Sequence, residues 1–419
     1  MIKKVIKKII GQGNITFAKQ QVKFLQDKLY LLSHSNIYTE IKDLSYLKYS
    51  QPDKNIFFGY YDISQFDKAE EKLLVHVVKK NADTKTDKAE LGYYFFESGE
   101  YVPFAETKAW CWQQGARLRW HPQNDNIVLF NDMCNGQYIT RVFDVKNKSI
   151  ITNIGAPLYD IDVTASYGLS LNFSRLQRLR PGYGYNTLPD KTAGQVAPND
   201  EGIFYVDLVC NKKELIISLA DLAKEIVDYR ADEHYINHIS ISPDGRKFMF
   251  FHIWTLKGDT HWKTRLCVYN LDNCKLSVLE KTDRVSHYDW LGNEGLIVTC
   301  WDENRRQYYC TYSIVAGEKV VLNDTHLIHD GHPTKLDNEA IIISDTYPLK
   351  HDMQTLFEYN LDKKCYRPII AVYSNARLYD EKRCDLHPRV SPSKKYITLD
   401  TTCENGVRQI LLIKNWRSN

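Results

Sequence analysis

Four histidines recur through the second half of the sequence at similar intervals. They are His238, His287, His332 and His387, separated by 49, 45 and 55 residues. Each stands in a short polar segment, and these segments read INH, SHYDW, DGHP and RCDLHPR. Imidazole exchanges protons near neutral pH and is also a common metal ligand. The pattern indicates one shared acid–base or metal site. The alternative is that each ring satisfies a buried backbone group in its own strand.

Side chains this far apart in sequence can meet if each one begins a unit of a repeated fold. From about residue 55, short strands rich in Val, Ile, Tyr and Phe alternate with Asp, Asn, Gly and Pro turns. The unit that begins at His238 reads as two hairpins, with a turn at 242–245 (SPDG). Similar units fit at about 57–106, 112–157 and 158–217. With the four histidine units they predict an all-β fold, a seven-bladed β-propeller whose blade-opening strands line a central channel.

The domain prediction is a helical N-terminal arm at 1–50 and a propeller at 51–419. Residues 14–32 have apolar positions suited to a helix of this arm. The third unit carries an insertion of about 25 irregular residues within 170–208. Long insertions in a compact scaffold often carry function.

Composition narrows the class of partner. The 55 Lys and Arg against 52 Asp and Glu give a net charge of +3, so no overall field attracts nucleic acid, and no nucleic-acid partner is expected. The 28 tyrosines favour surfaces that stack on sugars. A phosphate-binding glycine loop, a GxSxG elbow and an HExxH pair are absent from the sequence, so nucleotide hydrolysis, serine esterase and zincin chemistry lack their residues.

The expected location is the cytoplasm, peripheral at the inner membrane. The ten cysteines are scattered, no run of 18 apolar residues occurs, and the N-terminus lacks the apolar centre of a secretion signal. Residues 1–10 place isoleucine and valine on one helical face and four lysines on the other, which is typical of a helix on an anionic membrane. The alternative is a frayed basic terminus or a helix docked on its own domain.

Several strings resemble a known family. FFGYYDIS (57–64), WCWQQG (110–115), SLNFSRLQRLRPGYGY (170–185) and DTYP (345–348), with the four histidine segments, are similar to bacterial seven-bladed propellers related to the ulvan-lyase type of polysaccharide lyase. More distantly, they resemble oligogalacturonate lyases. The resemblance runs from about residue 55 to the end. It implies a carbon–oxygen lyase that acts by β-elimination on a uronate-containing glycan, in surface polysaccharide metabolism.

The resemblance also implies catalytic roles. β-Elimination needs a cation to offset the uronate carboxylate, a base for the C5 proton and an acid for the O4 oxygen. By resemblance, Tyr159 is the acid and a candidate base, His238 is the base or the C5-side neutraliser, and Arg175 binds the carboxylate. The alternatives are Tyr159 as a strand aromatic and Arg175 as a surface ion pair.

Metal and substrate residues follow from the same comparison. His287, His332, Cys384 and His387 resemble the zinc site of lyase-type propellers and imply a closed, structural Zn²⁺ site. The alternative is that Cys384 is a small buried hydrophobic residue and Asp385 is the polar contributor. The expected binders of an acidic oligosaccharide or polysaccharide are Gln113, Gln114, Asn131, Tyr183, Tyr185, Asn237 and Arg389.

One segment departs from the family pattern. WCWQQG presents Gln113 and Gln114 where the lyases carry a further catalytic histidine. A second hypothesis therefore stands beside the lyase, namely a noncatalytic glycan-binding or scaffold propeller in a polysaccharide biosynthesis system. The sequence does not indicate the glycan, its linkage or the oligomeric state.

Overall fold

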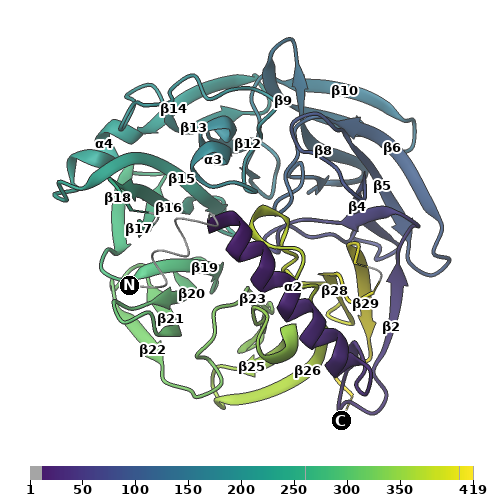
Figure 1. The fold of residues 1–419 in the computed structure, drawn as a ribbon. Helices are drawn as coiled ribbons and strands as arrows, with labels where there is room; N and C mark the ends of the chain where they lie inside the picture. Colours follow the sequence, from purple (N-terminus) through teal and green to yellow (C-terminus); the bar gives the residue numbers. More distant parts are fainter. Residues whose placement is uncertain (1–11, 260, 405, 419) are drawn as a thin grey trace.

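Seven antiparallel sheets surround one axis in the computed structural model, which describes residues 12–259, 261–404 and 406–418 (Figure 1). The prediction of an all-β, seven-bladed propeller is confirmed. Blades 1 to 5 each take four consecutive strands: β3 (Lys54–Phe57), β4 (Lys72–Lys79), β5 (Ala89–Phe95) and β6 (Tyr101–Thr107); β7 (Arg119–His121), β8 (Asn124–Cys134), β9 (Gln137–Asp144) and β10 (Ser149–Ile154); β11 (Asp160–Ile161), β12 (Tyr167–Ser170), β13 (Gly202–Asp207) and β14 (Lys212–Ser218); β15 (Ala231–Ile241), β16 (Lys247–Leu256), β17 (Trp262–Asn270) and β18 (Lys275–Glu280); β19 (Arg284–Trp290), β20 (Gly295–Trp301), β21 (Gln307–Ser313) and β22 (Lys319–Leu322).

The last two blades contain strands from both ends of the chain. Blade 6 consists of β23 (Thr334–Lys335), β24 (Ile341–Asp345), β25 (Met353–Asn360), β26 (Cys365–Tyr373) and β1 (Ile37–Tyr38), and blade 7 of β27 (Arg389–Val390), β28 (Tyr396–Thr401), β29 (Gln409–Lys414) and β2 (Ser45–Tyr49). Because β2 pairs with the C-terminal strand β29, the N-terminal segment closes the ring. The segment expected as an arm up to residue 50 therefore joins the propeller sheets from Ile37 onward.

The middle strands of the blades are almost continuously apolar. β16 reads KFMFFHIWTL, and eight of its ten residues are buried. A middle strand has a neighbouring blade on each of its two faces, so alternation of apolar and polar residues is lost there. The outer strand β10 packs against no further strand, and five of its six residues are exposed.

The turn at 242–245 joins β15 and β16 as the sequence predicts. The Ser242 hydroxyl donates to an Asp244 carboxylate oxygen at 2.6 Å, and the Gly245 N–H donates to the Ser242 carbonyl at 2.9 Å. Gly245 has a φ of +70°, a conformation that glycine adopts without a steric penalty. The turn fixes the register of this hairpin.

The helices are few: α2 (Gln12–Leu31), α3 (Phe173–Leu179), α4 (Leu219–Lys224) and the 3₁₀ turns η1 (Lys350–Asp352) and η2 (Asp380–Lys382). α2 matches the helix expected at 14–32 and crosses one face of the disc over blades 6 and 7 (Figure 1). The membrane helix expected at residues 1–10 lies outside the described residues. Among the helices of the described part of the chain, none has the length and apolarity to span a bilayer.

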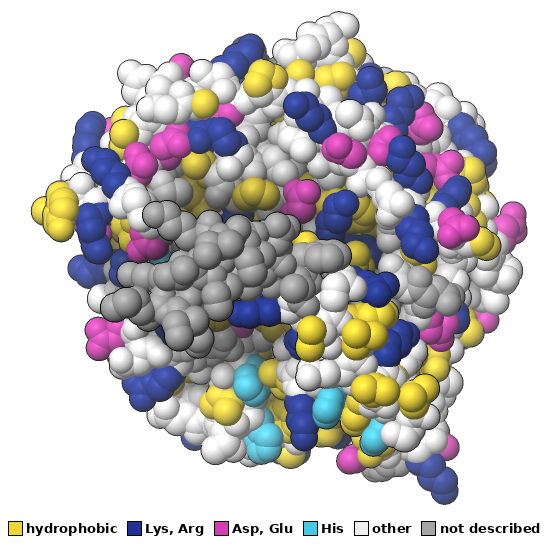
Figure 2. Space-filling model, in the orientation of Figure 1, with side chains coloured by type: hydrophobic (Ala, Val, Ile, Leu, Met, Phe, Trp, Pro, Cys, Tyr) yellow, Lys and Arg dark blue, Asp and Glu magenta, His cyan; other side chains and the backbone are white. Residues whose placement is uncertain are grey.

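α2 is attached to blade 6 by charged and aromatic contacts. Lys23 forms an ion pair with Asp352, the Arg377 guanidinium lies 3.8 Å from the Phe24 ring centroid, and the Tyr30 ring stacks on His351 at 3.9 Å. Val22, Leu25 and Leu29 leave apolar side chains exposed on the outer side of α2, and Leu32, directly after the helix, is also exposed. Apolar and basic side chains lie next to each other on this face of the molecule (Figure 2).

We expect the docking of α2 to weaken as pH rises. Burial, and then the neighbouring Asp352 carboxylate, raises the pKa of Asp27 to about 7, against a lowering effect of Lys23. In an undocked helix the pKa of Asp27 returns to about 3.9. Between about pH 4 and 7 the docked state therefore holds more protons than the undocked state, and docking is favoured at the acid end of this window.

Amide hydrogen exchange of α2, corrected for intrinsic rates, measures this effect. Protection should be greatest near pH 4, should fall as pH rises, and should level off above about pH 7. Asp27→Asn keeps the shape of the side chain without a titrating proton, so its protection should stay constant over the same range. Protection that rises with pH in the unmodified protein would contradict the expectation.

Candidate active site

The four histidines that recur in the sequence lie together at the centre of the propeller. The ring centroids of His287 and His332 are 4.1 Å apart, those of His332 and His387 are 4.5 Å apart, and those of His238 and His287 are 6.4 Å apart. All four side chains are buried, and His238 is the most exposed of them at 6%. We call this group the central histidine cluster.

Each histidine of the cluster lies at or just before the innermost strand of its blade. His238 belongs to β15 and His287 to β19, while His332 and His387 precede β23 and β27. His238 and His387 have φ values of 58° and 46°, a left-handed conformation that is uncommon outside glycine and costs on the order of 1 kcal/mol or more. Strained backbone of this kind is concentrated at functional sites.

Two carboxylates orient two of the rings. His287 Nδ1 donates to Asp330 at 2.9 Å, and His332 Nδ1 donates to Asp345 at 2.8 Å. Asp330 also accepts hydrogen bonds from the Trp301 indole N–H at 2.9 Å and from Thr299. A carboxylate on Nδ1 fixes the tautomer and leaves Nε2 as the available ligand atom, an arrangement common around protein-bound metals.

The environment keeps most of these rings neutral. Burial, and then the neighbouring imidazole, lowers the pKa of His238 well below its ordinary value. The same two causes lower the pKa values of His287 and His387. At His332 burial lowers the pKa, but the attraction of the Asp345 carboxylate for the protonated ring is stronger than the effect of burial. The pKa of His332 is therefore raised. Neutral imidazoles accept protons and bind cations, so the cluster is suited to either role.

Two histidines of the cluster and the adjacent Asp385 could hold a cation. One ligand atom from each of His332, Asp385 and His387 lies within 4.8 Å of the others. His332 Nε2, His387 Nε2 and Asp385 Oδ1 are buried and have no hydrogen-bond partner among the described residues. An unpaired buried polar atom costs about 1–3 kcal/mol. A divalent cation would satisfy all three atoms, so this group fits a metal.

The Cys384 thiol, which the family resemblance implied as a zinc ligand together with the histidines, is not among these ligand atoms. Its thiol lies 3.9 Å from the Asp385 carbonyl oxygen, and burial raises its pKa to about 12, which disfavours the thiolate that binds metals. The adjacent Asp385 takes its place in the group. The donors are therefore imidazole and carboxylate, which corrects the expected three-histidine, one-cysteine set.

Tyr159 lies beneath His238 with its hydroxyl fully engaged. The hydroxyl donates to Asn237 Oδ1 at 3.1 Å and accepts from Gln114 Nε2 at 2.7 Å and from the His238 backbone N–H at 3.1 Å. A hydroxyl has one donor and two acceptor sites, and all are used here. The ring is 0% exposed. These contacts make Tyr159, with Gln114 and Asn237, a support for the strained backbone of His238.

Arg175 lies outside the cluster. Its Nε donates to the His234 carbonyl at 2.7 Å, and its two terminal nitrogens donate to the carbonyls of Thr192 at 3.0 Å and Gln195 at 2.8 Å. These bonds attach the insertion between β12 and β13 to β15. With its guanidinium so occupied, Arg175 has no donor placed to bind a substrate carboxylate.

Most of the remaining expected binding residues also support structure. Gln113 donates to the carbonyls of Glu381 and Arg383. Asn131 donates to the Leu158 carbonyl and the Tyr185 hydroxyl. The Arg389 guanidinium is fully buried and pairs with Asp400 at 2.7 Å. They hold together the segments on which the cluster stands.

Tyr183 is the expected binding residue that reaches the cluster from the insertion. Its ring centroid lies 5.7 Å from that of His238 and 6.2 Å from that of Tyr60. Its hydroxyl accepts from Arg383 Nη2 at 2.7 Å, and Arg383 also pairs with Asp385 at 2.9 Å. The insertion therefore adds an aromatic ring beside the central histidines.

Two tyrosines among the histidines, Tyr60 and Tyr347, were not predicted as site residues. The Tyr60 ring centroid lies 4.7 Å from that of His387 and 5.2 Å from that of His238, and its buried hydroxyl has no partner among the described residues. Tyr347 Oη lies 3.5 Å from His287 Nε2. Both residues occur in strings that carry the family resemblance, FFGYYDIS and DTYP. This resemblance was the signal in the sequence that could have indicated them as site residues.

Comparison with solved structures identifies the fold. An oligogalacturonate lyase in complex with manganese superposes with a TM-score of 0.65 at 12% identity, covering 90% of this chain and 97% of that one. The chain has the fold of the oligogalacturonate lyases. The lyase from Vibrio parahaemolyticus gives 0.62 at 11% identity, covering 90% and 96%, and the tricorn protease gives 0.51 at 12%, covering 84% and 33%. No family model and no curated protein matches the sequence.

Proposed function

We propose that this protein is a lyase that cleaves uronate-containing glycans by β-elimination at the central histidine cluster. The observation that carries the proposal is the meeting of four buried histidines with a buried carboxylate, in a chain with an oligogalacturonate lyase fold. Among the described residues, His332 Nε2, His387 Nε2 and His238 Nδ1 have no hydrogen-bond partner. The ulvan-lyase relationship and a role in surface polysaccharide metabolism belong to the same proposal.

His238 is the base in this proposal. Its pKa is lowered well below the ordinary value by burial, so the ring is neutral at pH 7, and its Nδ1 has no hydrogen-bond partner among the described residues. It is also the most exposed histidine of the cluster. A neutral, unpaired imidazole nitrogen can take the C5 proton of a bound uronate.

Tyr60 is the proton donor in this proposal. Burial raises the pKa of its hydroxyl well above the ordinary value, so the hydroxyl holds its proton at neutral pH. The ring lies against both His238 and His387, so its hydroxyl is next to the proposed base and can give its proton to the departing O4 oxygen. Tyr60 thus replaces Tyr159, whose hydroxyl is engaged elsewhere.

His332, His387 and Asp385 would hold a divalent cation, with His287 beside them. When bound, such a cation supplies positive charge that offsets the uronate carboxylate and favours loss of the C5 proton. Imidazole and carboxylate donors are compatible with manganese and with zinc. Elemental analysis of purified protein decides between the expected zinc and manganese.

A noncatalytic glycan-binding propeller is the second candidate. It is favoured by the placement of Tyr159 and Arg175, two of the three expected catalytic groups, whose polar atoms are taken up by internal hydrogen bonds. In this case the cluster and its cation would bind an acidic sugar without breaking it.

Ultraviolet absorbance distinguishes the two candidates. Elimination leaves a C4–C5 double bond conjugated with the carboxyl group, whereas hydrolysis and simple binding leave none. We expect absorbance to rise when the protein is incubated with uronate oligosaccharides, to stop on chelation, and to return when Mn²⁺ or Zn²⁺ is added. If calorimetry shows that the same oligosaccharides bind but the absorbance does not change, the protein is a glycan-binding propeller and not a lyase.

A further inference from the structure

A groove lies beside the central histidine cluster and crosses blades 4 and 5. Its inner part, with a volume of about 550 Å³, is lined by Arg180, Trp262 and Arg383. Its outer part, about 690 Å³, shares Trp262 and continues to Arg284 and Trp301. Arg383 pairs with Asp385, which lies beside the cluster. The groove therefore begins one residue away from the proposed active site and extends away from it.

Two arginines lie against one tryptophan along this groove. The guanidinium carbons of Arg180 and Arg284 are 4.2 Å and 3.9 Å from the Trp262 ring centroid. Arg284 also lies 5.2 Å from the ring of Trp301, which donates its indole N–H to Asp330 and so connects the groove to His287. The aromatic rings hold both guanidiniums in fixed places.

These two guanidiniums lack an anionic partner. Within the described residues, neither Arg180 nor Arg284 donates a side-chain hydrogen bond or forms an ion pair, whereas nearby Arg178 pairs with both Asp190 and Glu233. Burial, and then repulsion from Arg180, lowers the pKa of Arg284. Asp330, which also accepts hydrogen bonds from His287 and Trp301, offsets part of this repulsion at Arg284. A carboxylate bound directly to the two guanidiniums would relieve the rest.

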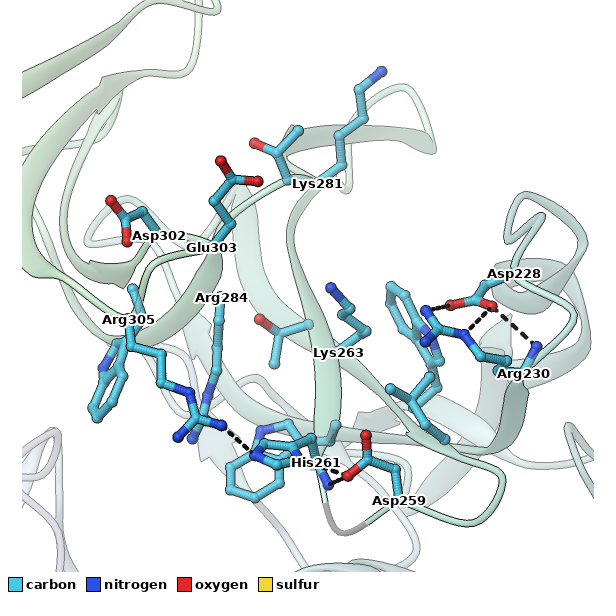
Figure 3. Close-up of a pocket in the computed structure, with 16 residues that line it drawn as sticks. Asp228, Arg230, Asp259, His261, Lys263, Lys281, Arg284, Asp302, Glu303 and Arg305 are labelled. Carbon is cyan, nitrogen blue, oxygen red and sulfur yellow. Dashed lines mark hydrogen bonds and ion pairs between the residues drawn. The ribbon is translucent and has the colours of Figure 1, made fainter.

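Four acidic side chains line the outer groove, and three of them, all but Glu303, are engaged by other partners. Asp228 pairs with Arg230, and Asp302 pairs with Arg306. Asp259 contacts His261 at 2.5 Å. Figure 3 shows Arg284, Lys263 and His261 together in this part of the groove. The groove thus presents aromatic surface and uncommitted positive charge.

We propose that this groove binds the continuation of an acidic oligosaccharide, with Arg180 and Arg284 holding the carboxylate of a second uronate. The inference rests on the proposed function, because the first uronate is the one that reacts at His238. A groove of this kind would make the protein selective for oligosaccharides longer than the reacting pair of sugars. It would also favour oligosaccharides that carry a carboxylate on the sugar bound in the groove.

Calorimetric titration with saturated oligouronates of two, three and four sugars, in protein containing its metal, tests this proposal. Arg284→Gln should weaken binding of the tri- and tetrauronate on the order of 10-fold and leave the diuronate almost unchanged, because charge-assisted hydrogen bonds to one carboxylate are lost. Arg180→Gln should act in the same way. Arg246→Gln, which removes an exposed arginine paired with Asp272 on blade 4, is the matched control and should leave all three affinities unchanged.

The outcomes separate this inference from the proposed lyase. Equal affinities of Arg284→Gln and unmodified protein for every length overturn the groove site, even where unsaturated product forms. Length-dependent binding that disappears in Arg284→Gln, without any unsaturated product, supports the groove and overturns the lyase. Absence of oligouronate binding overturns both. Should Arg284→Gln fail to fold, Arg180→Gln and Arg284→Lys give the same measurement, and Arg284→Lys, which keeps the charge, should lose less affinity.

Discussion

Replacing His238 by alanine should lower kcat for unsaturated product on the order of 10²- to 10⁴-fold, the contribution typical of one general base. His238 is the neutral imidazole with an unpartnered Nδ1 among the described residues, and it is the least buried histidine of the cluster. KM should change little, because binding of the glycan depends on the cation and the groove. Initial rates followed by ultraviolet absorbance give both quantities. A variant with the kcat of the unmodified protein would remove His238 from the mechanism.

Tyr159→Phe provides a matched comparison with this variant. Phenylalanine fills the same space but removes the hydroxyl that accepts the His238 N–H at 3.1 Å. If Tyr159 acts through the position of His238, the double variant should be no slower than His238→Ala alone. Independent, multiplying losses would instead show that Tyr159 takes part in proton transfer itself.

The blade pattern was predictable because each blade repeats the same physical solution. A buried middle strand needs an apolar run such as KFMFFHIW, and a hairpin needs a turn such as SPDG at 242–245. The innermost strand of every blade lines the channel, so the intervals between His238, His287, His332 and His387 already implied that these side chains meet. Repetition makes contacts between distant residues readable from the sequence.

Which of two neighbouring side chains contributes to the site was not predictable in this way. Cys384 and Asp385 are adjacent, and successive side chains of an extended segment lie on opposite sides. The choice of Asp385 depends on the local backbone, which includes the left-handed φ of 46° at His387. The position of Arg175 was not predictable for a similar reason. Arg175 binds backbone carbonyls of the insertion between β12 and β13, and the path of this insertion follows no periodicity in the sequence.

Loss of the metal should follow from His332→Ala and from Asp385→Asn, and with it loss of product formation. Both changes remove one of the three atoms that lie within 4.8 Å of one another. The unmodified protein should be stabilised by its metal, by about 2.7 kcal/mol when free metal exceeds the dissociation constant 100-fold. In the two variants the melting temperature should no longer respond to added Mn²⁺ or Zn²⁺, and elemental analysis should find no bound metal.

Two further variants decide which residues around the cluster bind the metal and which support it. Cys384→Ser should keep the metal, because the thiol is not part of the ligand group, while Asp345→Asn should weaken metal binding about 10- to 100-fold by releasing the His332 ring. The reverse pattern, with metal lost in Cys384→Ser and kept in Asp385→Asn, would restore the thiolate site that the sequence predicted. Each of the four variants changes a single side chain. If their circular dichroism spectra match that of the unmodified protein, a difference in metal content is caused by the changed side chain and not by unfolding.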